Sequence, residues 1–212
     1  MPVELTTEQH LLVKSAAERL RKEFEGEVNV ETIQRLMTDS FDKIMAMARV
    51  PQWVPIVTEK FARDRLRALT RLELGDSAKP AILFLCVHNA GRSQMAAGFA
   101  RHLGGDRVDV FSGGTEPADE INRAAVSAMA EIGIDITKQS PQPWADEIVR
   151  AADVIVSMGC GDACPVYPGK KYVDWELEDP AGKPIEEVRP IRDDIRARVE
   201  ALLEELVPAG TA

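Results

Sequence analysis

One eight-residue loop, from Cys86 to Ser93, constrains this 212-residue chain more than any other feature. The short apolar run before it, Ile82-Leu83-Phe84-Leu85, is typical of a buried strand, and the amphipathic pattern after it is typical of a helix. A loop between a strand end and a helix start can turn its backbone N–H groups toward an anion, at the positive end of the helix dipole. The loop therefore predicts a binding site for an oxyanion.

Two side chains of this loop can do chemistry. Arg92 carries a planar guanidinium that can hold two oxygens of a tetrahedral anion. The same positive field favours the thiolate of Cys86, which is the nucleophilic form of the side chain. Because Gly91 and Ser93 flank the arginine of this C-x5-R pattern, we favour covalent transfer to sulfur over a buried cysteine followed by an ordinary surface arginine.

The segment Cys86-Val-His-Asn-Ala-Gly-Arg-Ser-Gln-Met95 resembles the phosphate loop of the low-molecular-weight protein tyrosine phosphatases and of the arsenate reductases built on the same fold. It is more similar to the reductases, and the resemblance covers about residues 80–206. The resemblance implies that Cys86 is the nucleophile and that Arg92 binds the anion. It also implies that the other residues of the loop bind substrate, namely Val87, His88, Asn89, Ala90, Gly91 and Ser93.

Two further cysteines, Cys160 and Cys164, follow another apolar run at residues 153–157. A zinc site would need two further ligands beside these cysteines, and the chain offers few candidates, since it contains only three histidines. Inert buried thiols are a second interpretation, and a redox pair that exchanges disulfides with Cys86 is a third. The Cys-x3-Cys-Pro segment resembles the resolving loop of thioredoxin-coupled arsenate reductases, although its spacing is shorter than in some members. We therefore favour the redox pair and expect no bound metal.

An Asp-Pro pair at Asp179 follows the last expected strand. Asp-Pro is a common turn by itself, but the family resemblance implies that Asp179 is the general acid that protonates the departing oxygen. Two positions depart from the family pattern. His88 stands where the family often has glycine, so we expect a left-handed backbone, with positive φ, at His88. Ala97 replaces a glutamate that helps to bind potassium in some reductases, so we expect no such ion site.

The composition, with 45% hydrophobic and 29% charged residues, is that of a soluble globular protein. No apolar run reaches membrane-spanning length and no secretory signal is present, so we expect a cytoplasmic protein that does not bind membranes. The net charge of −9 falls on residues 80–212, since residues 1–79 carry 13 basic and 13 acidic side chains. An acidic domain argues against a nucleic acid substrate.

Residues 1–75 predict an N-terminal three-helix domain, and residues 76–80 a linker. A capping-box pattern at Thr6–Gln9 starts the first helix. Apolar positions from Ile33 to Ala48 mark the second, and the third is expected from Val57 to Leu74. For the basic side chains of the third helix we favour a solvated face, balanced by the acids of the domain, over contact with DNA. The partner of this domain is left open.

Residues 81–212 predict an α/β domain with a four-stranded parallel sheet, helices on both faces, and the fold of the low-molecular-weight phosphatases. Cys86 then falls at the carboxyl edge of the sheet, where ligands bind. Ser112–Thr115 is expected to be a tight turn. Strands are expected at residues 82–85, 108–111, 153–157 and 171–174, and later helices at residues 122–132, 144–151 and 191–206.

The resemblance implies that the protein is an arsenate reductase. Cys86 would attack arsenate to form a thiol-arsenate adduct, Cys160 would resolve it, and Cys164 would move the disulfide away from Cys86. Thioredoxin would then reduce the disulfide with electrons that come ultimately from NADPH, and no cofactor would be bound to the chain. Two alternatives stay open: a phosphatase of small phosphoesters, which would not need Cys160 and Cys164, and a non-catalytic sensor that binds arsenic through the three thiols.

Overall fold

The computed structural model describes residues 4–75, 78–159 and 166–208. The chain divides into two compact units, Met1–Asp76 and Ser77–Ala212, each with a hydrophobic core of its own. Within the described residues, no helix is both long enough and apolar enough to cross a membrane.

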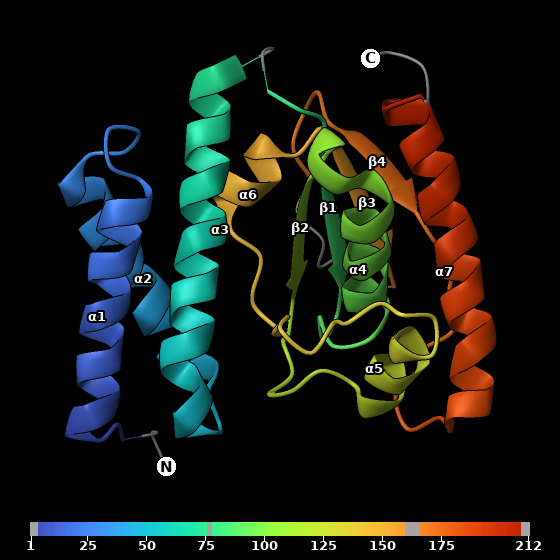
Figure 1. The fold of residues 1–212 in the computed structure, drawn as a ribbon, viewed down its shortest axis with the longest axis horizontal. Coiled ribbons are helices and arrows are strands. Elements are labelled where there is room, and N and C mark those ends of the chain that lie inside the picture. Colours follow the sequence, from blue (N-terminus) through green and yellow to red (C-terminus); the bar gives the residue numbers. More distant parts are fainter. Residues whose placement is uncertain (1–3, 76–77, 160–165, 209–212) are drawn as a thin grey trace. The chain divides into compact units, whose positions relative to one another are not determined.

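The first unit consists of α1 (Thr7–Glu23), α2 (Val30–Met47), the short 3-10 helix η1 (Pro51–Trp53) and α3 (Val54–Leu74) (Figure 1). The predicted capping box is confirmed: the Thr6 hydroxyl accepts from the Gln9 amide at 3.2 Å, and the Gln9 side chain accepts from the Thr6 amide at 2.8 Å. The core comprises Ala16, Leu20, Phe24, Ile33, Leu36, Met37, Ala62 and Leu66.

The third helix begins three residues before the predicted Val57. Pro55 lies in the first turn of α3, where its missing N–H costs no hydrogen bond, so the helix can begin before it. Several basic side chains of α3 pair with acids of the same unit, as expected, but the predicted solvated face is wrong in part, because Arg65 and Arg71 are buried. Arg63 pairs with Glu23 and Glu59, at 2.9 and 2.8 Å.

In the second unit, four parallel strands form a sheet in the order β2-β1-β3-β4. The strands are β1 (Ala81–Cys86), β2 (Asp109–Gly114), β3 (Val154–Met158) and β4 (Lys171–Asp174). Every residue of β1 is buried, because this strand lies between β2 and β3. The predicted α/β class and four-stranded parallel sheet are confirmed.

The predicted tight turn at Ser112–Thr115 is wrong, since Ser112, Gly113 and Gly114 continue β2 and pair with Phe84, Leu85 and Cys86. The two glycines are needed for close packing. A Cβ atom on Gly113 would lie 3.0 Å from the backbone of Trp144, and one on Gly114 would lie 2.7 Å from the Val87 carbonyl oxygen. The strand thus extends to the level of Cys86, and small residues keep room for the loop that follows β1.

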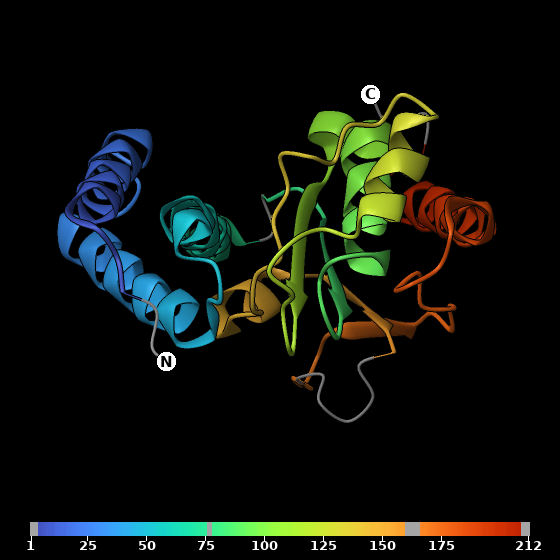
Figure 2. The same ribbon diagram turned by 90° about the horizontal axis from the view of Figure 1, so that it is seen from below.

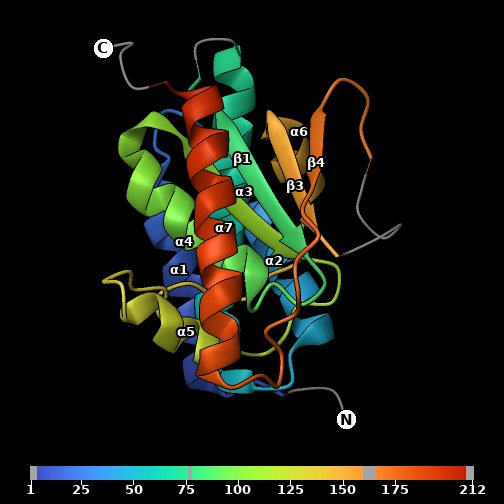
Figure 3. The ribbon, with the colours of Figure 1, turned by 90° about the vertical axis from the view of Figure 1, so that its right-hand side faces the viewer.

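Three helices of the second unit, α4 (Arg92–Gly104), α5 (Arg123–Ala130) and α7 (Ile185–Leu206), cover one face of the sheet (Figures 2 and 3). The short helix α6 (Asp146–Ala151) lies on the opposite face, and the 3-10 turn η3 (Gly105–Arg107) follows α4. The sequence predicted that the last helix begins after Pro190, but α7 begins at Ile185 and contains that proline. Pro190 lies in its second turn, so only one helical N–H is lost and the rest of the helix is regular.

Candidate functional site

The loop from Val87 to Gly91 connects the carboxyl end of β1 to the first turn of α4. Its carbonyl groups point away from the centre of the loop, because they accept hydrogen bonds from the segment before α5. Glu116, Ala118 and Asn122 donate to the carbonyls of Val87, His88 and Ala90 at 2.8, 2.9 and 2.9 Å. The amides of His88, Ala90 and Gly91 find no acceptor in the part of the chain that the structure describes. These amides are therefore available to an anion, together with the N-terminal dipole of α4.

Cys86 is buried at the base of this loop. Its Sγ atom lies 3.0 Å from the Ser93 hydroxyl and accepts a hydrogen bond from the Asn89 amide at 3.1 Å. The Ser93 oxygen in turn accepts from the Asn89 side-chain amide at 2.9 Å, which leaves the hydroxyl proton for the sulfur. Two donors are thus directed at one sulfur, and they fix its position at the base of the loop.

Asn89 holds the loop in shape through both its backbone and its side chain. It is the residue of the loop with a left-handed backbone, at φ 46°, so the expectation of such a conformation at His88 is wrong. Asparagine tolerates that region better than most residues. Its fully buried side-chain oxygen accepts from the Gln94 side chain and the Gln142 amide, each at 3.0 Å. His88 is exposed, and its ring contacts the Glu116 carbonyl.

We call residues 86–93 the anion loop and residues 175–182, which lie between β4 and α7, the acid loop. The acid loop reaches over the anion loop. Arg92 donates to Asp179 at 2.6 Å and to the Leu177 carbonyl at 3.4 Å. The other oxygen of Asp179 accepts from the Ala181 amide at 2.9 Å. The Arg92 side chain is 9% exposed and that of Asp179 is 47% exposed, so the arginine is fixed and the carboxylate faces solvent.

The anion loop and the acid loop enclose a cavity of about 30 Å³. A cavity needs roughly 10–15 Å³ of comparable volume to hold one water molecule, so this space suits a small group. Its walls include the Cys86 thiol, the Arg92 guanidinium and the Asp179 carboxylate, which the structure thus brings together. Asn122 also lines the cavity, and Gln94 and Gln142 lie behind the loop. The sequence did not indicate these three residues, because none of them belongs to the C-x5-R pattern.

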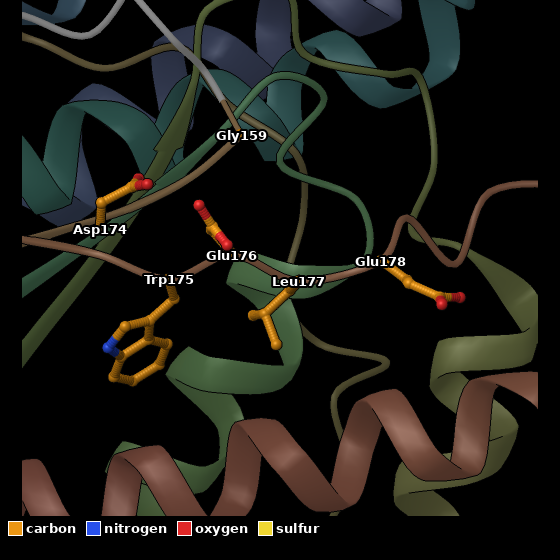
Figure 4. Close-up of a pocket in the computed structure, with 6 residues that line it drawn as sticks. All are labelled: Gly159, Asp174, Trp175, Glu176, Leu177 and Glu178. Carbon is orange, nitrogen blue, oxygen red and sulfur yellow. The ribbon is translucent and has the colours of Figure 1, made fainter.

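A second, open hollow of about 460 Å³ lies beside the acid loop (Figure 4). Trp175 and Leu177 point toward the core helices, whereas Asp174 and Glu176 point to the other side. Gly159, the residue after β3, also lines this hollow. The predicted resolving cysteines, Cys160 and Cys164, follow Gly159 and lie outside the described residues. No group of three metal-binding side chains occurs among the residues that are described.

A parallel α/β sheet with a cysteine and an arginine in one anion loop, and an aspartate above them, defines a cysteine-dependent protein of the phosphatase type. Residues 81–210 match the family model "Low molecular weight phosphotyrosine protein phosphatase", and residues 13–70 match "Protein-tyrosine-phosphatase-like, N-terminal domain". The chain belongs to the low molecular weight phosphotyrosine protein phosphatase family, as the resemblance of its loop indicated.

Several named relatives of this chain are arsenate reductases. The chain is 41% identical to the arsenate reductase of Halalkalibacterium halodurans over 136 residues, which cover 59% of this chain and 96% of the relative. It is 37% identical to the glutaredoxin arsenate reductase of Synechocystis over 128 residues, or 59% of this chain and 97% of that one. A solved structure, the Corynebacterium glutamicum thioredoxin-dependent arsenate reductase Cg_ArsC1', matches with a TM-score of 0.79 and 38% identity. This match covers 92% of this chain and 96% of that one, so it extends over both units.

Proposed function

We propose that this protein reduces arsenate to arsenite with electrons from thioredoxin. The observation that carries the proposal is the small cavity in which the Cys86 thiol, the Arg92 guanidinium and the Asp179 carboxylate face one another. Its size suits an inorganic oxyanion, and the named relatives at 37–41% identity are arsenate reductases.

In the first step, the Cys86 thiolate attacks arsenic while the loop amides and Arg92 hold the oxygens of the anion. A sulfur–arsenic bond forms and an arsenic–oxygen bond breaks, and Asp179 gives its proton to the departing oxygen, which leaves as water. The anion competes with Asp179 for Arg92, because a two-point grip on its oxygens draws on the same guanidinium that donates to the carboxylate.

In the second step, Cys160 attacks the sulfur of Cys86. A disulfide forms, the electron pair of the sulfur–arsenic bond passes to arsenic, and arsenite departs. Cys164 then attacks Cys160, which frees Cys86 and leaves a Cys160–Cys164 disulfide. A thioredoxin dithiol reduces this disulfide, and NADPH reduces thioredoxin in turn.

The test is arsenate-dependent NADPH oxidation with thioredoxin and thioredoxin reductase, for the wild type and for Cys164→Ser. We expect many turnovers in the wild type and about one per enzyme in the variant, because the Cys86–Cys160 disulfide then persists. Steady turnover in both would exclude Cys164 from the mechanism. Consumption only when glutaredoxin and glutathione replace thioredoxin would assign a different donor.

The phosphatase alternative predicts a different pattern. It requires no NADPH consumption with either donor, together with hydrolysis of a small phosphoester that survives Cys160→Ser and Cys164→Ser. Binding of arsenite without any consumption of reductant or hydrolysis of a phosphoester would favour the non-catalytic sensor.

A further inference from the structure

The acid loop carries an exposed catalytic carboxylate next to a buried anchor. Asp179 is 47% exposed, whereas Pro180, the next residue, is buried. A Cβ atom on Gly91 would lie 2.5 Å from the Pro180 ring, so the proline packs directly on the anion loop. The position of Asp179 over the substrate therefore depends on how Pro180 is held.

Asn122 holds this anchor from the opposite side. Its side-chain Nδ2 donates to the Pro180 carbonyl at 3.2 Å, and its own backbone amide donates to the Ala90 carbonyl of the anion loop at 2.9 Å. Its side-chain Oδ1 caps α5 by accepting from the Ala125 amide at 2.9 Å. Asn122 therefore connects three parts of the site: the anion loop, the acid loop and the N-terminus of a helix that is packed in the core.

The helix beneath Asn122 is rigidly attached. Ala125, Ala128 and Met129 of α5 are fully buried in the core of the second unit. Arg192 of α7 donates to the Ala128 carbonyl at 2.8 Å, which joins the two helices. The hydrogen bond from Asn122 therefore attaches the acid loop to a helix that is fixed in the core.

The contact from Asn122 matters most when substrate is bound. In the structure, Arg92 also holds the acid loop, through Asp179 and the Leu177 carbonyl. An oxyanion competes for that guanidinium, and the arginine contacts to the acid loop weaken at the moment when Asp179 must act. The hydrogen bond from Asn122 to the Pro180 carbonyl uses neither the guanidinium nor the loop amides that hold the anion, so it persists when these groups bind the anion.

We propose that Asn122 is a positioning residue that holds the acid loop, and with it Asp179, over the bound oxyanion during proton transfer. This inference rests on the proposed function insofar as it takes Asp179 as the general acid. Misplacement of a catalytic group by about 1 Å can lower a rate by about 100-fold. Loss of the Asn122 contact should therefore lower kcat more than it changes KM.

Two variants separate this role from helix capping. Asn122→Ser and Asn122→Asp both keep an oxygen that can cap α5, since serine and aspartate are as good as asparagine at this position. Neither can donate to the Pro180 carbonyl as the amide does, because serine is shorter and aspartate only accepts. Asn29→Ser is the matched control, because Asn29 caps α2 in the same way, with its side chain accepting from Thr32 at 2.8 Å.

The first measurement is hydrogen exchange of the intact protein, which does not depend on any activity. We expect faster exchange of the peptide covering residues 175–183 in both Asn122 variants, unchanged exchange in α5, and no effect of Asn29→Ser on either. If exchange in α5 also rises in Asn122→Ser, serine has failed to replace the helix cap, and the result for Asn122→Asp then tests the proposal. Unchanged exchange of residues 175–183 in both variants would overturn the proposal.

The second measurement is a double-mutant cycle with Asp179→Asn in the thioredoxin assay. Asn122→Ser should lower kcat by about 10- to 100-fold with KM within about 2-fold. In the Asp179→Asn background it should change kcat by less than about 2-fold, because the group that it positions is already gone. Equal losses in both backgrounds would refute the proposal. A wild type without arsenate turnover would refute the proposed function instead, and the exchange experiment would still test Asn122.

Discussion

Asn89 shows how single side chains set the geometry of this site. Its left-handed backbone, at φ 46°, turns the loop, and its side-chain amide orients the Ser93 hydroxyl that faces the Cys86 sulfur. Its oxygen is held in turn by Gln94 and by the backbone of Gln142. Cys86, the proposed nucleophile, is thus supported by a buried polar network rather than by substrate contacts alone.

At the same scale, Gly159 leaves room for Arg92. A Cβ atom on this glycine would lie 2.9 Å from an Arg92 nitrogen, and its φ is +76°. We expect Gly159→Ala to displace the guanidinium and to weaken the binding of inorganic phosphate by about 10-fold. This change in Kd corresponds to roughly 1.4 kcal/mol of binding free energy. Isothermal titration calorimetry measures this.

Gly169→Ala is the matched control for that experiment. Gly169 has nearly the same backbone, at φ +79°, but nothing lies within 4 Å of its added Cβ atom. Equal losses of phosphate affinity in the two variants would assign the effect to backbone strain and contradict the role of Gly159 beside Arg92.

At the scale of helices and strands, ion pairs connect elements whose apolar faces form the cores. In the first unit, Glu59 of α3 accepts from Arg19 of α1 and from Arg63 of its own helix. The hydrogen bond from Arg19 is the largest contribution that lowers the pKa of Glu59 below its ordinary value, and Arg63 acts in the same direction against the effect of burial.

This lowered pKa predicts a pH dependence of stability. A carboxyl group whose pKa is lower in the folded state stabilises the fold above its unfolded pKa, about 4.3 for glutamate, and loses that contribution as the pH falls through the folded value. We expect the Tm of the first unit to fall as the pH drops below about 4.3. The fall should be smaller in Glu59→Gln.

Circular dichroism of the helical signal, recorded as thermal melts from pH 6 to pH 3, measures this difference. Glu18→Gln is the control, because Glu18 is exposed on the same helix as Arg19. The same pH profile in Glu59→Gln and in the wild type would show that the Arg19–Glu59 pair does not stabilise the unit.

At the scale of the whole molecule, the chain has two cores that are built from separate parts of the sequence. Residues 13–69 supply one and residues 82–207 the other. We propose that residues 1–75 and 81–212 are separate domains. A fragment of residues 1–75 should then give a helical spectrum and a cooperative thermal transition.

Two substitutions control the fragment experiment. Leu36→Ala removes a fully buried side chain and should lower the Tm of the fragment by about 10 °C or more. Leu12 is 48% exposed, so Leu12→Ala should leave the Tm nearly unchanged. A fragment without helical signal would show that this segment depends on the rest of the chain for its folding.

Short-range patterns were enough to predict the features that are local along the chain. The capping box at Thr6 and the buried run of β1 follow from short-range patterns. The C-x5-R loop follows in the same way, because strand, loop and helix are consecutive and their N–H groups must meet at one point. The family resemblance of that loop then named Asp179, which the structure places 2.6 Å from Arg92.

Tertiary contacts alone bring together the distant residues that support the site. Asn122 and Gln142 act through hydrogen bonds and Gly159 through its missing Cβ atom, and all three lie far in sequence from the loop that follows β1. The glycines of β2 were mistaken for a turn for the same reason, since their role is close packing against Trp144 and Val87. Such contacts leave no periodic pattern, because they depend on how parallel strands bring separate segments to one edge of the sheet.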